Sequence, residues 1–76
     1  MPTVLRERGF KFFFYSQEGN EPPHIHVEKG DGAAKFWLDP VRLAAKEGFK
    51  KPELRAIVGI IEKHAAELLR AWNEIE

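Results

Sequence analysis

The chain contains no cysteine and no long hydrophobic run, and these two absences exclude several classes of protein. Without cysteine there can be no disulfide, no thiolate nucleophile and no thiolate metal site. No segment approaches the roughly 18 apolar residues that a membrane-spanning helix needs. The first ten residues, MPTVLRERGF, also lack the apolar stretch of a signal peptide. We therefore expect a cytoplasmic protein that has no membrane partner.

The chain also lacks an excess of either charge. Its 12 basic residues balance its 12 acidic residues, which argues against duplex binding driven by overall charge but leaves room for a local basic patch. With 43% hydrophobic and 12% aromatic residues, the composition is globular and too apolar for a disordered tail. The 76 residues predict one small domain, residues 1–76, whose thin core could gain stability from oligomerisation.

Aromatic and β-branched residues predict strands in the first half of the chain. The expected strands are GFKFFFYS (residues 9–16), HIHVEKG (24–30) and AAKFWL (33–38), separated by turn-forming residues. The stretch VRLAAKEG (41–48) is either a fourth strand or a helical turn, since leucine, alanine, lysine and glutamate favour helix. Because side chains alternate along a strand, one set should face the core: Phe10, Phe12, Phe14, Ile25, Val27, Ala34, Phe36 and Leu38, with Val41, Leu43 and Ala45 if the fourth strand forms.

The second half of the chain predicts one long helix. Lys51-Pro52-Glu53 is typical of a helix start, because proline suits the first turn and a carboxylate suits the positive end of the helix dipole. Apolar residues then recur at spacings of three and four: Leu54, Ile57, Val58, Ile61, Ala65, Leu68 and Trp72. Gly59 could let this helix approach the sheet closely. The expected fold is α+β, a three- to four-stranded antiparallel sheet with one long C-terminal helix packed on one face.

A single helix leaves the other face of the sheet open to water or to a partner. Alternation assigns these residues to that open face: Phe13, Tyr15, His24, His26, Glu28, Lys35 and Trp37, with Arg42 and Lys46 if the fourth strand forms. The predicted binding residues are Phe13, Tyr15, Lys35, Trp37 and Arg42. Single-stranded RNA or DNA could stack bases on the rings while the cations meet phosphates. A protein partner or a second copy could bury the rings instead, and the rings could also simply pack against loops.

The stretch PPHIHVE (residues 22–28) places two imidazoles and a carboxylate on one strand face. His24, His26 and Glu28 could ligate a metal ion. His24 and His26 could instead act as acid and base in phosphodiester cleavage, with Lys35 or Arg42 steadying the phosphate. The sequence shows no clustered carboxylates to support either role, so no cofactor is expected. His64 is expected to lie on the helix flank with its ring packed and a nitrogen hydrogen-bonded.

Four stretches together resemble a known family: EPPHIHV (21–27), GAAKFWLDPVRLA (32–44), GFKKPELR (48–55) and HAAELLRAWNE (64–74). They are similar to the small bacterial domain-of-unknown-function family 4160, over essentially the whole chain. The run Pro-Pro-His-x-His-Val is the most specific part of the resemblance. The resemblance implies a compact α+β domain of prokaryotic origin, often encoded beside another small gene as in toxin–antitoxin pairs. It carries over no catalytic residue.

The expected function is that of a small interaction module whose open sheet face binds a partner protein or nucleic acid, within a toxin–antitoxin-like two-gene system. The alternatives are a histidine-dependent ribonuclease-like toxin that uses His24 and His26, and a metal-binding protein. Neutral net charge and the absence of a dense acid–base cluster favour binding over catalysis.

Overall fold

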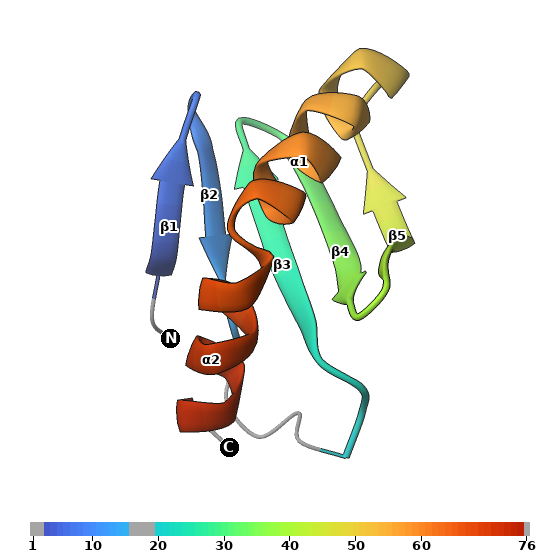
Figure 1. The fold of residues 1–76 in the computed structure, drawn as a ribbon. Helices are drawn as coiled ribbons and strands as arrows, with labels where there is room; N and C mark the ends of the chain where they lie inside the picture. The colour runs from blue at the N-terminus through green and yellow to red at the C-terminus, as the bar shows by residue number, and fades with distance from the viewer. Residues whose placement is uncertain (1–2, 16–19, 76) are drawn as a thin grey trace.

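Five antiparallel strands follow one another along the chain and across the sheet (Figure 1). The computed structural model describes residues 3–15 and 20–75. Its strands are β1 (Thr3–Glu7), β2 (Phe10–Phe13), β3 (His24–Lys29), β4 (Gly32–Leu38) and β5 (Val41–Glu47). The expected α+β class is confirmed, and residues 41–47 form a strand. The sheet has five strands rather than the expected three or four, because β1 was not predicted.

Strand β1 was not predicted because the residues of the turn after it are not typical of a hairpin turn. Arg8 and Gly9 connect β1 to β2, and both adopt positive φ angles, 56° and 86°. Two-residue hairpin turns need such left-handed conformations, which glycine adopts readily and arginine rarely does. The pair Arg8-Gly9 therefore does not stand out as a hairpin turn in the sequence.

The helical half consists of two helices that lie over the same face of the sheet (Figure 1). They are α1 (Lys51–Lys63) and α2 (Ala65–Ile75), separated at His64. The prediction of one continuous helix is wrong at this point. The backbone N–H of His64 is shared between the carbonyls of Ile60 and Ile61, at 3.2 and 3.1 Å, a tightened geometry typical of helix ends.

The core fills the space between the helices and the sheet. The core includes all eight residues that alternation predicted to face inward in the segments 9–16, 24–30 and 33–38. The predicted alternation is therefore confirmed in these segments. The helical residues of the core are Ile57, Ile60, Ile61, Leu68 and Trp72. Two members were not predicted, Ile60 and Phe49. Phe49 packs directly on Gly32, where a Cβ atom would lie only 2.4 Å from the Phe49 ring.

Gly59 does not mediate close packing of the helix on the sheet. It is exposed, and a Cβ atom added there would meet nothing within 4 Å. The expectation that this glycine lets α1 approach the sheet is therefore wrong. Of the helices in residues 3–15 and 20–75, none is long and apolar enough to cross a membrane.

Candidate interaction surface on the open sheet face

The strand register determines which side chains lie on the open face, the side of the sheet away from the helices. Phe13 pairs with His26, His26 with Lys35, and Trp37 with Arg42. Residues directly opposite each other in an antiparallel pair share a face. Four of the five predicted binding residues therefore lie together on the open face, and Tyr15 joins them through ring contacts with Phe13 and His26.

A bulge in β5 changes the faces of its last residues. The register shifts so that Ala44 has no partner on β4. Beyond it, Ala45 lies opposite Lys35 and Lys46 lies opposite Ala34. An extra residue in a strand resets its alternation. Ala45, expected in the core, therefore lies on the open face, and Lys46, expected on the open face, lies on the helix side.

Five aromatic side chains form a continuous row of ring contacts, which we call the ring row: Phe13, Tyr15, His24, His26 and Trp37. Successive ring centroids are close, at 5.3 Å for Phe13–Tyr15, 4.4 Å for Tyr15–His26, 5.2 Å for His24–His26 and 5.8 Å for His24–Trp37. Tyr15 is 40% exposed, and His26 and Trp37 are half-buried. These three rings are the part of the row that a partner could reach.

Phe13 and His24 are buried, which corrects two predictions: that Phe13 is available for binding, and that His24 faces outward as a candidate for catalysis or metal binding. Phe13 is only 2% exposed, because it stacks on His26 and the Lys11 amine lies 5.4 Å from its ring centre. His24 is fully buried. It is the first residue of β3, at the end of the sheet near α2, where its ring contacts both Trp37 and the α2 residue Trp72, at 4.9 Å. His24 therefore does not simply point away from the helices.

The imidazole of His24 also has a defined hydrogen bond. Its Nδ1 lies 3.0 Å from the carbonyl oxygen of Pro22. A carbonyl oxygen can only accept, so Nδ1 carries a proton and donates it. This bond joins the proline pair of the PPHIHVE stretch to the buried ring. In the conformation observed, His24 offers no exposed surface to a substrate, which weakens the acid–base interpretation.

The described residues do not gather a metal site around the two histidines. His24 and His26 are neighbours, but within residues 3–15 and 20–75 no group of three or more histidine, aspartate or glutamate side chains is placed to hold a metal ion. Glu28, the predicted third ligand, is exposed and lies opposite Lys11 and Ala33 in the strand register, on the same face as His26.

Lys35 is held by the carboxylate of Glu21, a contact that no sequence pattern predicts. Its Nζ lies 2.6 Å from Oε1 of Glu21 and 4.8 Å from the ring centre of Trp37. The same Glu21 oxygen lies 3.7 Å from Nδ1 of His24. Glu21 lies in a loop, where no periodicity places its side chain, so the sequence carried no signal for this contact. The charge of Lys35 is thus largely compensated, and its amine covers one face of Trp37.

A shallow hollow lies beside the ring row, between β3 and β5. It has a volume of about 300 Å³. Its floor includes Ala33 and Ala45, and its rim includes His26, Lys35 and Glu47. We call it the alanine hollow. The space is open because the side chains of Ala33 and Ala45, on neighbouring strands, are small. Single alanines are common in strands, so the sequence did not predict the hollow.

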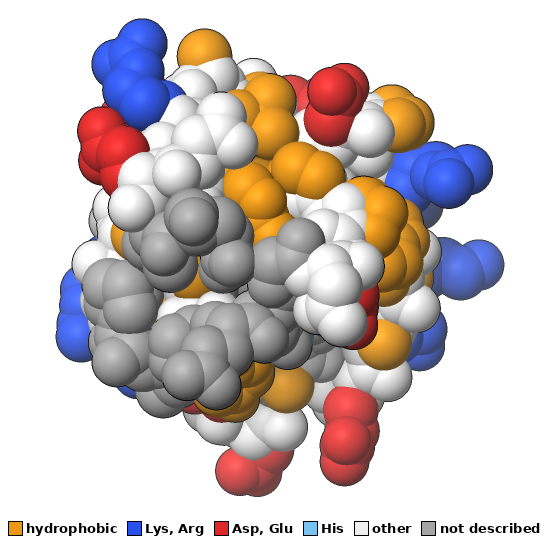
Figure 2. All heavy atoms as spheres, turned by 90° about the horizontal axis from the view of Figure 1, so that it is seen from below, with side chains coloured by type: hydrophobic (Ala, Val, Ile, Leu, Met, Phe, Trp, Pro, Cys, Tyr) orange, Lys and Arg blue, Asp and Glu red, His pale blue; other side chains and the backbone are white. Residues whose placement is uncertain are grey.

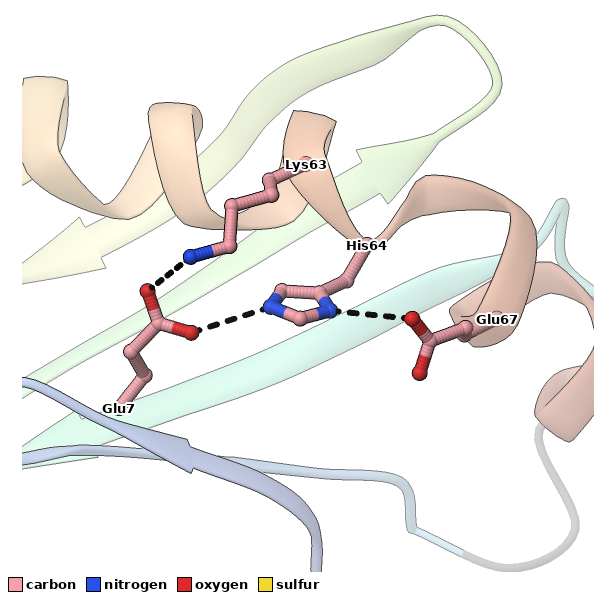
Figure 3. Close-up of polar contacts among 4 residues, drawn as sticks. All are labelled: Glu7, Lys63, His64 and Glu67. Carbon is pink, nitrogen blue, oxygen red and sulfur yellow. Dashed lines mark hydrogen bonds and ion pairs between the residues drawn. The ribbon is translucent and has the colours of Figure 1, made fainter.

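A separate polar cluster joins β1 to the junction of the two helices (Figure 3). Oε2 of Glu7 accepts a hydrogen bond from Nζ of Lys63 at 3.0 Å. The His64 ring lies between two carboxylates, with Nε2 3.0 Å from Glu7 and Nδ1 3.2 Å from Glu67. Both ring nitrogens can donate only when the imidazole is protonated. The expected role of His64, a boundary histidine with a bonded nitrogen, is confirmed.

This arrangement shifts two pKa values in opposite directions. The hydrogen bonds from Lys63 and then from His64 hold the pKa of Glu7 below its usual value. The hydrogen bonds to Glu7 and then to Glu67 raise the pKa of His64 above its usual value. Each shift favours the charged form of its group. The cluster lies on the helix side of the sheet, so it is separate from the ring row on the open face.

The chain belongs to the DUF4160 family, a domain of unknown function, which it matches over residues 9–73. The resemblance noted in the sequence is thereby confirmed. The matched region contains β2 to β5 and nearly all of the helical layer, and it leaves out β1. No curated protein and no solved structure matches the chain significantly. The family description assigns no activity, so the function has to be argued from the geometry of the open face.

Proposed function

We propose that this DUF4160 protein is an interaction module that binds a partner protein through the open face of its sheet. The observation that supports this most strongly is the position of the reachable rings of Tyr15, His26 and Trp37 next to the alanine hollow. Protein interfaces favour aromatic anchors beside small pockets that can receive a partner's side chain. The helices cover the opposite face of the sheet, which leaves this face for a partner.

The face of the sheet is a better docking surface than its edges. The edge strands are β1 and β5, and both pair irregularly with their neighbours. The register of β1 shifts between Thr3 and Leu5, and the register of β5 shifts where it passes Lys35 and Phe36 of β4. Bulges twist an edge strand and hinder the addition of another strand to it. We therefore expect the partner to lie across the face rather than to extend the sheet.

A protein partner fits this surface better than a single-stranded nucleic acid does. Base stacking needs an open ring face, and phosphate binding needs an available cation. Lys35 covers one face of Trp37 and is itself paired with Glu21. The open face itself carries charges of both signs beside its apolar hollow, since Lys35 and Glu47 both line that hollow. A polar rim around an apolar centre is typical of protein interfaces. The end of the molecule next to this face likewise shows separated side chains of both charges with hydrophobic ones between them (Figure 2).

The resemblance provides the first candidate partner, the product of an adjacent small gene. A toxin–antitoxin-like setting and a cytoplasmic location stay predictions that accompany this proposal. The ribonuclease-like and metal-binding alternatives rank below it, because His24 is buried and because the described residues gather no group of three metal-ligating side chains.

The alanine hollow provides the most direct test. Ala45→Arg should fill the hollow with a long side chain, and because Ala45 is exposed the fold should be preserved. We expect binding to the adjacent gene's product to weaken at least about tenfold by calorimetry, as for loss of an interface anchor. Ala66→Arg, on an exposed position of α2, makes the same chemical change away from the open face and should leave binding unchanged.

Two results would contradict the proposal. Equal binding by the wild type and Ala45→Arg would show that the partner does not use the hollow. Tight binding of an oligouridine that Ala45→Arg abolishes, with no binding of the protein partner, would instead identify the open face as a nucleic-acid surface.

A further inference from the structure

We infer that the groove between β5 and α1 is a second docking site, and that it takes an acidic amphipathic helix of a partner protein. This groove lies on the helix side of the sheet, so it is distinct from the open face and does not depend on the function proposed for that face. It has a volume of about 410 Å³ and is lined by apolar side chains from both elements together with basic side chains.

The floor of the groove is apolar and partly exposed. Leu43 of β5 is 43% exposed, one of only two large hydrophobic side chains so exposed in the part of the chain that the structure describes. It lies opposite Phe36 and therefore on the helix side. Half-buried Val41, Leu54 and Val58 continue this surface across to α1. A continuous apolar strip next to a helix is the type of surface that receives the apolar face of another helix.

The rim of the groove is basic. Lys51 and Arg55 line it from α1, and no carboxylate does. Arg42 borders the groove at the edge strand β5, although its place opposite Trp37 directs its side chain to the open face. Within residues 3–15 and 20–75, none of these three side chains forms an ion pair. This concentration is notable because the whole chain has a formal net charge of zero.

The carboxylate in the first turn of α1 is held at the helix end. Glu53 accepts a hydrogen bond at 2.9 Å from the backbone N–H of Lys50, where it also meets the partial positive charge of the helix N-terminus. Glu53 therefore offsets the helix dipole and does not line the groove, so it leaves the charges of Lys51 and Arg55 at the rim uncompensated.

The apolar floor and the basic rim together favour an acidic amphipathic helix over other kinds of occupant. Carboxylates on the partner would meet Lys51 and Arg55, whose planar guanidinium suits bidentate pairing, while leucine-like side chains would cover the floor. A second copy docked symmetrically would bring like charges together. A nucleic acid would find no exposed ring to stack on, because Phe36 is fully buried. Strand addition is disfavoured by the bulge in β5.

The test uses the full chain and a designed peptide. The probe is a fluorescein-labelled peptide of about four helical turns, with leucines at positions i, i+3, i+4 and i+7 and glutamates on the remaining face. Fluorescence anisotropy should show saturable binding that weakens as salt is added. Amide shifts in the ¹⁵N-labelled protein should concentrate at Leu43, Leu54 and Val58.

Charge reversal at one position provides the matched control. Arg55→Glu should weaken peptide binding about tenfold, because it replaces an attraction at the rim with a repulsion. Arg70→Glu makes the same change at an exposed position of α2 and should leave binding unchanged. Ala45→Arg should also leave it unchanged, which keeps this site distinguishable from the open face.

Any of four results would overturn the inference. They are an absence of saturable binding, equal losses in Arg55→Glu and Arg70→Glu, equally tight binding of a peptide with lysine in place of glutamate, and amide shifts located on the open face. An oligouridine that displaces the peptide and shifts the same groove residues would assign the groove to nucleic acid and also overturn it.

Discussion

The two histidines of PPHIHVE differ at the scale of single residues, although only one residue separates them. His24 is fully buried among Trp37, Trp72 and His26, with its Nδ1 proton donated to Pro22. His26 is half-buried and forms part of the rim of the alanine hollow. The first therefore orders the end of the sheet, and the second exposes part of its ring beside the hollow.

Gly59 is the residue at which a substitution should stabilise the protein. It lies within α1, is exposed, and has open space where a Cβ atom would be. Because glycine in a helix interior costs up to about 1 kcal/mol relative to alanine, Gly59→Ala should raise the free energy of unfolding by about 0.5–1 kcal/mol. The melting temperature should rise by a few degrees, up to about 8 °C, in circular dichroism.

Gly32→Ala serves as the opposite control for this prediction. A Cβ atom there would collide with the Phe49 ring, so this variant should melt at a lower temperature. A lower melting temperature for Gly59→Ala would show that α1 needs glycine at position 59 for a reason other than packing.

At the scale of elements, α1 is held to the sheet by its buried isoleucines. Ile61 is fully buried in the core. Ile61→Ala should lower the free energy of unfolding by about 2–4 kcal/mol, from lost burial and the cavity left behind. A domain of this size has a total stability of only several kcal/mol, so much of the protein should unfold. Urea titration measures the loss, and a value below about 0.5 kcal/mol would mean that Ile61 does not pack as observed.

The junction between α1 and α2 should make stability depend on pH. The pKa of His64 is raised by its hydrogen bonds to Glu7 and Glu67, so its contribution is complete below its usual value of 6.5 and is lost as the pH rises through the folded value. The pKa of Glu7 is lowered by Lys63 and His64, so its contribution is complete above its usual value of 4.5 and is lost on acidification below that. The cluster should therefore stabilise most between pH 4.5 and 6.5.

Melting curves of the wild type and His64→Gln across this range check the prediction. The wild type should have its largest advantage between pH 4.5 and 6.5, and the advantage should shrink as the pH rises above 6.5. A difference in melting temperature that does not change with pH would show that His64 contributes only by packing.

At the scale of the whole molecule, β5 separates the two proposed surfaces. Ala45 faces the alanine hollow, and Leu43 faces the groove beside α1. The bulge at Ala44 lies between them and gives the strand its change of face. The two surfaces can therefore be altered independently by substitutions in one short strand. Their chemistry also differs, since the hollow has a rim of mixed charge and the groove has a basic one.

The sequence by itself determined the features that depend on short-range periodicity. Alternation in GFKFFF, HIHV and AAKFWL correctly assigned the core side of three strands, because the period of two is a property of the extended backbone itself. Apolar spacing in the C-terminal half correctly predicted a helical layer facing the sheet. The open face and most of its predicted residues follow directly from these two patterns.

Only the tertiary structure decided the features that depend on residues far apart in the chain. Phe13 is buried because of a stack with His26 on another strand, and Lys46 changes face because β5 bulges against β4. The helix is interrupted where His64 meets Glu7, 57 positions away. The alanine hollow and the basic groove are each lined by residues from different parts of the chain. Short-range sequence patterns predict single elements, so they do not predict a space between elements.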